Sequence, residues 1–352
     1  MKISFMLKRE DFYKINRDTL EKYYQNSRTE KRLYIYPELN AIVTARPSKT
    51  VRQYLYTEFR VNGSPIKRLL VRLYAMVMLN SGGLFAAKSL KMKTDADKDT
   101  LIYPCNKKYR VFDFKNNQVS VFVKVGFPGE SLANEIAFRV ENRADFIPGL
   151  LYSDETSYTE TIIDGCPVAR TGQQMTALSD RAFAVWSDYI LPYTKQIPAP
   201  EYAAMSQKRV EQLKNTVQEM GKTIDVPALE TWCTKLLRAM QAETDFVPVS
   251  LSHGDLQPGN IWVENKTGKL YIIDWESWEE RSTWYDRALL YENLRRTDGI
   301  IQYAKQKDLV HVTVLLEDLI FRLTELTNLP YNYGCTEFNN SIKELGGENS
   351  DV

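Results

Sequence analysis

The stretch LSHGDLQPGNIWVENKTGKLYIIDWE, residues 251–276, decides the fold and contains one of the two histidines of the chain. Two apolar runs, NIWVE and LYIID, flank the five residues NKTGK, whose Asn and Gly suit a short hairpin loop. If Glu264 opposes Leu270 in an antiparallel hairpin, the same register places Asn260 opposite Asp274. Directly opposed side chains project from one face about 4.5–5.5 Å apart. The hairpin therefore predicts an amide and a carboxylate at one point.

An amide oxygen and a carboxylate are hard ligands that suit Mg²⁺, which fills the rest of its shell with phosphate oxygens and water. Asp255 lies on the loop that leads into the same hairpin, where a carboxylate can accept a proton from a hydroxyl that attacks a phosphate. The alternative is that Asp255 and Asn260 cap the loop and that Asp274 merely ends a strand. Each residue alone favours that alternative, but three residues at this spacing favour a site for phosphoryl transfer.

The motif HGDLQPGN followed by IIDWE resembles that of the aminoglycoside phosphotransferase and choline kinase family, whose fold is protein-kinase-like. The family pattern is His-Gly/Asn-Asp, four residues, Asn, a hairpin, then Ile-Asp-x-Glu/Asp, and every position is filled here. The resemblance implies that Asp255 is the catalytic base and that Asn260 and Asp274 are magnesium ligands. It implies ATP as the phosphate donor, with GTP left open. His253 and Asp286 are interpreted as residues that brace the catalytic loop.

The region upstream changes to a period of two, which is typical of strands. The runs TLIYP, YRVFDF, QVSVFVKV, LLYS and YTETII predict five strands, with a helix in ESLANEIAFRVEN after the third. The resemblance implies that Lys124 contacts nucleotide phosphates and pairs with Glu135 on that helix. The alternative is an edge-strand lysine and a solvated helix glutamate.

The resemblance also implies a hinge between two lobes in YTETIIDG. There the backbone of Glu160 and Ile162 is expected to bond an adenine edge, with Thr159 at the back of the pocket. The loop PCNKKYR has no glycine, so it is not the Gly-rich loop of protein kinases. Lys107 and Lys108 in this loop are interpreted as the solvated tip of a hairpin rather than as phosphate contacts.

The whole chain is predicted to have an α+β, protein-kinase-like fold with a small five-stranded antiparallel lobe and a mainly helical lobe. An extra α/β segment, residues 1–95, is expected to be a cap or an elaborated N-lobe. Residues 96–165 are expected to bind nucleotide, and residues 166–352 to carry the catalytic loop and the acceptor site. The polar run KMKTDADKD predicts the first boundary. The apolar run LLVRLYAMVMLNSGGLF, interrupted by Arg72 and two glycines, predicts a buried helix rather than a membrane span.

The stretch WESWEERSTWY suggests how an acceptor could be recognised. Aromatic faces beside carboxylates can hold a cationic head group, although aromatic residues after a strand more often pack in a core. Glu276 and Trp278 are the candidate substrate contacts. The aromatic residues of this stretch are Trp275, Trp278, Trp284 and Tyr285.

The composition limits the classes of partner. A net charge of +1 gives no electrostatic footprint for nucleic acid. Four widely separated cysteines argue against a zinc site and a disulfide scaffold. The first residues, MKISFMLKREDF, contain no apolar core of a signal peptide. We therefore expect a cytoplasmic protein with no membrane span, and we leave the oligomeric state open.

The leading hypothesis is a kinase for a hydroxyl of a small molecule, namely a sugar, an aminoglycoside or an amino alcohol such as choline. A second hypothesis is a protein or surface-glycan kinase on the same fold. A third is a nucleotide-binding pseudokinase that acts as a scaffold. The intact set of polar residues counts against the third, since function depends on the site and not on the fold.

Overall fold

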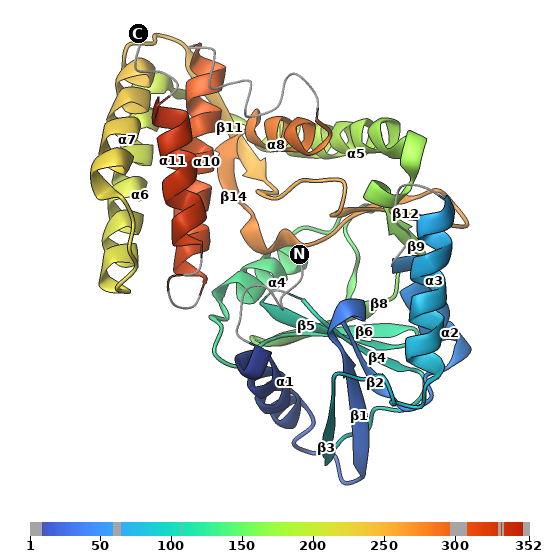
Figure 1. Cartoon of the computed structure of the whole chain (residues 1–352). Helices are drawn as coiled ribbons and strands as arrows, with labels where there is room; N and C mark the ends of the chain where they lie inside the picture. Colours follow the sequence, from blue (N-terminus) through green and yellow to red (C-terminus); the bar gives the residue numbers. More distant parts are fainter. Residues whose placement is uncertain are drawn as a thin grey trace. The chain divides into compact units, whose positions relative to one another are not determined.

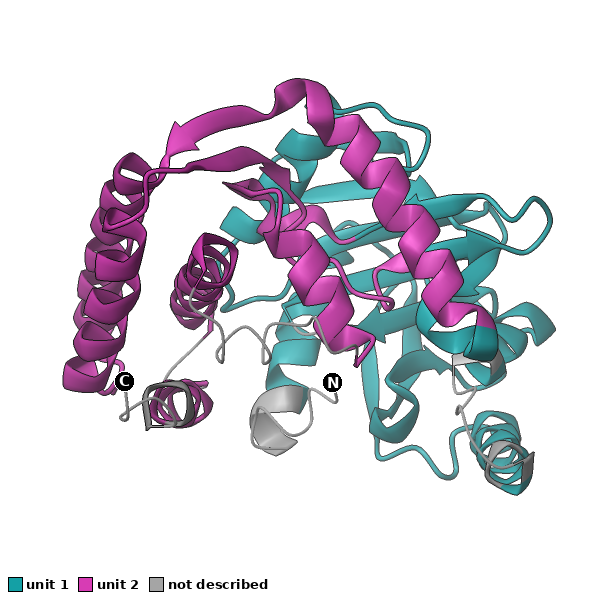
Figure 2. Cartoon of the chain, turned by 90° about the horizontal axis from the view of Figure 1, so that it is seen from above, with its two compact units in different colours: residues 1–173, 262–273 teal, residues 174–261, 274–352 magenta. Residues whose placement is uncertain are grey.

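A computed structural model describes residues 9–58, 65–105, 107–295, 308–329, 332 and 334–347. The chain divides into two compact units, coloured separately in Figure 2: residues 1–173 with 262–273, and residues 174–261 with 274–352. The chain therefore leaves the second unit after Ile261, forms most of a hairpin in the first, and returns to the second at Asp274.

The first unit is built on an eight-stranded sheet in the order β3-β1-β2-β4-β5-β6-β8-β7, with every neighbouring pair antiparallel (Figure 1). A small sheet, β13-β12-β9, also belongs to it apart from the first residue of β12. The strands are β1 (Glu30–Tyr36), β2 (Ala41–Thr44), β3 (Lys88–Lys93), β4 (Thr100–Pro104), β5 (Lys108–Asp113), β6 (Gln118–Val123), β7 (Leu150–Ser153), β8 (Ser157–Thr161), β9 (Gly165–Pro167), β12 (Ile261–Glu264) and β13 (Leu270–Ile272). The helices are α1 (Arg9–Tyr23), α2 (Lys49–Glu58), α3 (Pro65–Asn80) and α4 (Glu130–Glu141).

The predicted α+β architecture is confirmed, and the five predicted strands are β4 to β8. The sheet is larger than predicted because three more strands, all from residues 1–95, continue it. The first three residues of the predicted boundary KMKTDADKD belong to β3, where Met92 pairs with Lys31 of β1. A shared sheet favours an elaborated N-lobe over a separate cap, and the three-part division of the chain stays a prediction.

The two faces of this sheet are covered by different helices. On one face, apolar residues of α2, α3 and α4 form a core with Phe112, Val119 and Val121 of the central strands. On the other face, Tyr23 at the end of α1 stacks on Phe122 of β6, with ring centroids 4.1 Å apart. Because side chains alternate along a strand, each residue of β5 and β6 belongs to one face or the other.

Helix α3 is not the buried helix that its composition predicts. Only Ala75 and Leu79 of its described side chains are fully buried. Leu69, Leu73 and Val77 are 58, 42 and 52% exposed, and they recur at the spacing that places them on one side of a helix. The apolar run thus forms a helix whose outward side is also apolar.

The second unit is mainly helical and also contains a three-stranded antiparallel sheet, β10-β11-β14, which the sequence analysis missed. Helices α6, α7, α10 and α11 lie side by side around a large apolar core (Figure 1). No helix in the described part of the chain is both long and apolar enough to cross a membrane. The elements are α5 (Met175–Ile190), β10 (Lys195–Pro198), α6 (Ala199–Glu219), α7 (Val226–Gln241), β11 (Phe246–Ser252), β14 (Glu279–Ser282), α8 (Tyr285–Asn293), α10 (Leu309–Thr327) and α11 (Cys335–Gly347).

Candidate active site

Strand β11 leads directly into the predicted catalytic loop, and Asp286 in the first turn of α8 holds the start of that loop. Its buried carboxylate accepts four hydrogen bonds, two on each oxygen, at 2.7–3.0 Å. A carboxylate also suits the first turn of a helix, where backbone N–H groups are exposed. The predicted bracing role of Asp286 therefore has a clear geometric basis. The donors are Ser252 Oγ, the backbone N–H groups of His253 and Gly254, and Trp186 Nε1.

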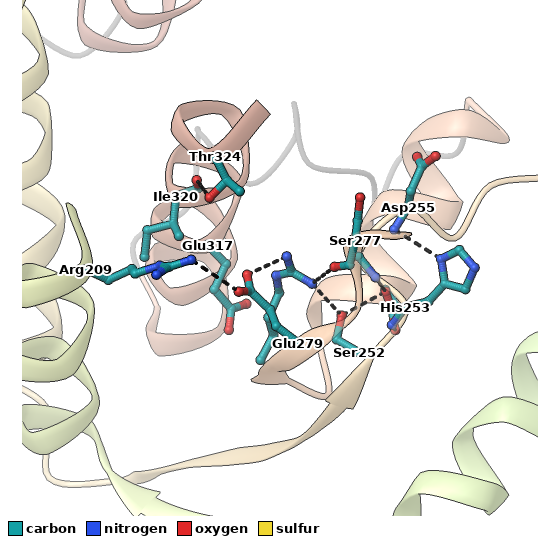
Figure 3. Close-up of polar contacts among 12 residues, drawn as sticks. Arg209, Ser252, His253, Asp255, Ser277, Glu279, Glu317, Ile320 and Thr324 are labelled. Atoms are coloured by element: carbon teal, nitrogen blue, oxygen red, sulfur yellow. Dashed lines mark hydrogen bonds and ion pairs between the residues drawn. The ribbon is translucent and has the colours of Figure 1, made fainter. Parts of the chain in front are cut away.

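The ring of His253 is fully buried and lies against Trp275, with centroids 4.5 Å apart. The backbone N–H of Asp255 donates to His253 Nδ1 at 3.2 Å, a contact drawn in Figure 3. The ring nitrogen that accepts this bond carries no proton, so the histidine orients the backbone of Asp255 rather than acting as an acid there. This contact fits the predicted bracing role.

Gly254 is required by its surroundings. Its φ is +78°, a conformation that residues with a Cβ rarely adopt, and a Cβ would lie 2.2 Å from the carbonyl oxygen of Ser277 and 2.5 Å from Arg281 Nη1. We expect Gly254→Ala to destabilise the fold by about 1–3 kcal/mol and to lower turnover, because the loop must shift. Denaturant unfolding and steady-state turnover measure both effects. Gly259→Ala is the control, since its Cβ would meet nothing closer than 4.0 Å, and equal effects of the two changes would contradict this account.

The carboxylate of Asp255 is the point on which the predicted site residues converge. Asn260 Nδ2 donates to its backbone oxygen at 2.8 Å and to Oδ2 at 2.9 Å, and Gln257 Nε2 lies 3.0 Å from both carboxylate oxygens. Burial raises the pKa of the Asp255 carboxyl to about 7, and the negative charges of Asp274 and Glu276 act in the same direction. Asn260 thus bonds Asp255 directly, and the charges of Asp274 and Glu276 act on its carboxyl group.

The predicted hairpin is present as β12 and β13, which are neighbours in the small sheet. Its loop closes with a bond from Glu264 N to the oxygen of Lys269, one residue short of the predicted partner, Leu270. The direct opposition of Asn260 and Asp274 therefore stays a prediction. Asp274 itself has φ 71° and ψ 54°, a left-handed conformation that is uncommon outside glycine and clusters at functional sites.

Arg281 is a buried cation of this loop that the sequence analysis missed. Its guanidinium donates to the oxygen of Ser277 at 3.0 Å and pairs with Glu279 at 2.5 Å, and a longer bond of 3.4 Å reaches Ser252 Oγ. Glu279 also lies 3.9 Å from Arg209 of α6, as Figure 3 shows. Arg281 thus ties the end of β11 to the turn after Asp274. No motif marks it, because the turn and β11 are far apart in sequence.

The proposed acceptor residues Glu276 and Trp278 are both half-buried. Glu276 lies within the turn that follows Asp274, and Trp278 comes directly after it. The prediction that the aromatic residues of this stretch form a cage for a cationic group is wrong for Trp275 and Tyr285. Trp275 and Tyr285 are fully buried, where Trp275 packs between His253 and Trp186 and Tyr285 is part of the helical core. These two residues pack in the core and present no face to a ligand.

In the first unit, the buried Glu135 of α4 pairs with Lys108 at 2.9 Å, not with Lys124. The amino group of Lys124 donates instead to the backbone oxygen of Cys105 at 2.5 Å and lies over the ring of Tyr109. Burial lowers the pKa of Lys124 to about 8. The predicted pair of Lys124 and Glu135 is therefore wrong. The interpretation of Lys107 and Lys108 as a solvated hairpin tip is wrong as well, because both side chains are buried.

A pocket of the first unit is lined mainly by apolar residues of β5, β6 and the segment after β8, together with Trp262 and Ile273 of the hairpin. Glu160 and Ile162 line it, as the hinge prediction requires. Thr159 does not, because its hydroxyl bonds Ser120 on the opposite face of the sheet. Its predicted place at the back of the pocket is wrong.

The prediction that the backbone of Glu160 and Ile162 bonds an adenine edge also needs a correction. The N–H of Ile162 donates to the oxygen of Asn117, so β6 already uses it. Glu160 lies two residues back along the same ladder, opposite Val119, so its backbone groups also face β6. Thr161 and Ile163 also line the pocket, and the oxygen of Ile163 already accepts from the N–H of Gly165.

Asn260 and Asp274 fit a magnesium site. Asn260 donates both bonds of its amide nitrogen to Asp255, so its carbonyl oxygen is the atom of this amide that could bind a cation. The carboxylates of Asp274 and Glu276 each interact unfavourably with that of Asp255, and a bound cation would offset this. In the described residues no cluster of three or more His, Cys, Asp or Glu side chains is placed to hold a metal. Mg²⁺ needs no such cluster, because phosphate oxygens and water complete its shell.

The comparisons with known proteins support the predicted resemblance. Residues 174–288, which are 115 of the 352 residues, match the family model of choline/ethanolamine kinase. No curated protein matches the chain in sequence.

Among solved structures, a thermostable mutant of aminoglycoside phosphotransferase APH(4)-Ia in complex with AMP-PNP and hygromycin B is similar. It has 12% identity and a TM-score of 0.48, over 72% of this chain and 95% of that one. Choline kinase LicA from Streptococcus pneumoniae has 12% identity and a TM-score of 0.45, over 78% and 99%. Plasmodium vivax ethanolamine kinase has 11% identity and a TM-score of 0.45, over 86% and 96%.

Proposed function

We propose, from the match of residues 174–288 to choline/ethanolamine kinases, that this chain is a Mg²⁺-dependent phosphotransferase. It moves the γ-phosphate of ATP to a hydroxyl group of a small molecule. The observation that carries the proposal is the arrangement around Asp255, where Asn260 donates to the carboxylate and Asp274 and Glu276 act on its charge. A loop-capping role would need neither the second carboxylate nor the left-handed backbone of Asp274.

In this reaction Asp255 acts as the general base. Its carboxylate accepts the proton of the acceptor hydroxyl while that oxygen forms a bond to the γ-phosphorus and the bond to the ADP oxygen breaks. The hydrogen bonds from Gln257 and Asn260 fix the direction of the carboxylate. His253 and Asp286 fix the backbone that carries it. Preorganised groups of this kind need no rearrangement during the reaction.

Asn260 and Asp274 would hold Mg²⁺, which when bound neutralises charge on the phosphates. In the first unit, the pocket beside Glu160 and Ile162 is the proposed site of the base. Glu276 and Trp278 are the proposed acceptor contacts, because they adjoin Asp274. A carboxylate beside an aromatic ring favours acceptors with an amino group, such as amino alcohols and aminoglycosides.

A screen for ADP release tests this function. We expect Mg²⁺ and ATP with one of a panel of choline, ethanolamine, aminoglycosides and sugars to release ADP at least about tenfold faster than without acceptor, because the hydroxyl replaces water as the nucleophile. Asp274→Ala should weaken the binding of Mg²⁺-ATP, measured by calorimetry, and Asp188→Ala, an exposed residue of α5, is the control.

The outcomes of the screen separate the three hypotheses. Transfer to a protein or a surface glycan, with none to any small molecule, would favour the second. Tight nucleotide binding without turnover under every condition would favour the pseudokinase. A chain that binds no nucleotide with Mg²⁺ would contradict the whole proposal.

A further inference from the structure

Two lysines lie near the predicted nucleotide site, and the sheet separates them. In the ladder between β5 and β6, Lys108 opposes Val123 and Tyr109 opposes Phe122. Opposed residues share a face and successive residues alternate. Lys108 therefore lies on the same face as Arg110 and Phe112, which line the pocket. Lys124 follows Phe122 by two residues and lies on the face that α1 covers.

The contacts of Lys124 agree with this placement. Its amino group is held by the backbone oxygen of Cys105 and lies over the ring of Tyr109, 5.1 Å from the centroid. Tyr109 in turn stacks on Phe122, which stacks on Tyr23 of α1. A side chain enclosed in this way would have to cross the sheet to reach a ligand in the pocket.

The contacts of Lys108 place it at the pocket face. It is 5% exposed and its ammonium lies 2.9 Å from Glu135 Oε2. Glu135 Oε1 also accepts from the hydroxyl of Tyr158 at 3.0 Å and lies 3.5 Å from Arg139 Nη1, so the carboxylate is held from three sides. The pairing with Glu135 fixes the position of the Lys108 ammonium group. An ammonium group has three N–H donors, so this pairing does not use all of its hydrogen-bonding capacity.

The spacing along β5 suits an extended ligand. Lys108 lies two residues before Arg110, which corresponds to roughly 7 Å along an antiparallel strand. Arg110 and Phe112 line the pocket on the same face of β5, so a ligand that extended from the pocket along β5 toward its first residue would reach Lys108 and Glu135. A buried cation at that end offsets phosphate charge.

We propose that Lys108, and not Lys124, is the lysine that binds the nucleotide phosphates, with Glu135 orienting its ammonium. This rests on the proposed function, in that the pocket binds a nucleotide. Lys124, which directly follows β6, is thereby replaced by Lys108, the first residue of the neighbouring strand β5.

The test compares Lys108→Met with the matched change Lys124→Met in the full chain, by calorimetric titration with Mg²⁺-ATP and with adenosine. A charge-assisted bond to phosphate contributes to ATP affinity and not to adenosine affinity, so Lys108→Met should weaken ATP binding about 10- to 100-fold and leave adenosine binding within about twofold. Lys124→Met should keep the preference for ATP. A merely structural role of Lys108 would lower both affinities together and would overturn the inference.

Two further variants guard against misfolding of Lys108→Met, which leaves Glu135 without its partner. Lys108→Met with Glu135→Gln removes both charges of the pair, and it should show the same loss of ATP preference. Lys108→Met with Val123→Lys returns a lysine to the same face from the opposite strand, and it should recover a large part of that preference.

The two proposals fail in different ways. A wild-type chain that binds ATP while Lys108→Met binds it equally well overturns this inference alone, as does a loss of ATP preference in Lys124→Met. A wild-type chain that binds neither adenosine nor ATP overturns the proposed function and this inference with it.

Discussion

Asp255→Asn is expected to reduce phosphoryl transfer by at least about 10²- to 10⁴-fold, the usual contribution of a positioned general base. An amide cannot accept the proton of the hydroxyl, although it keeps the shape of the carboxylate and can still accept from Asn260. Binding of Mg²⁺-ATP should change little. Turnover measured by ADP release and affinity measured by calorimetry separate these two effects. Asp188→Asn, on the exposed side of α5, is the matched control.

The stability of the same variant tests whether it is folded. The pKa of Asp255 is raised to about 7 in the folded chain, chiefly by burial. A carboxyl with a raised pKa stabilises the fold less as the pH increases from its ordinary value through 7, because the charged form is disfavoured. Asp255→Asn should therefore melt no lower than wild type at pH 8. Unchanged turnover would show that Asp255 is not the base, and a large drop in Tm would show that its role is structural.

Asp286→Ala is expected to produce a large loss of stability. The change removes the acceptor of four buried donors, and each unpaired buried donor costs about 1–3 kcal/mol. Part of this cost is recovered if water enters, so we expect a loss of at least about 3 kcal/mol. Denaturant unfolding at constant m-value measures it. Turnover should fall as well, because the backbone of the catalytic loop loses its anchor.

Asp188→Ala serves again as the control, since that carboxylate lies on the surface. Asp286→Asn is a useful intermediate. It keeps one acceptor oxygen but presents an NH₂ group to N–H donors, so it should lie between wild type and Asp286→Ala. A loss below about 1 kcal/mol for Asp286→Ala would mean that the four hydrogen bonds are replaced by other contacts, and the bracing role would be abandoned.

The residues of the catalytic loop could be predicted because their chemistry is local in sequence. Asp255 and Asn260 are five residues apart, and a short hairpin returns the chain to Asp274. Their convergence needs only loop and hairpin geometry. Arg281 could not be predicted, because its role depends on the pairing of β14 with β11, which no local pattern specifies.

The first unit shows where the same reasoning fails. The strands were recognised, but the phase of their alternation was not. Because a strand has a period of two, an error of one residue moves a side chain to the opposite face. The resemblance implies roles for Lys124 and Thr159 but does not specify this phase, and the structure places both residues on the face opposite the pocket. The phase depends on which face the helices cover, and that is a long-range property.

The outward side of α3 has a consequence for the behaviour of the protein in solution. Its exposed apolar side chains form a row on one helix, larger than the scattered apolar residues usual on a protein surface. A net charge of +1 supplies little repulsion between molecules at neutral pH. Sulfate and phosphate strengthen contacts between apolar surfaces. We therefore expect contacts through this helix to promote association in such salts, so that chloride or low-salt buffers suit concentrated samples better.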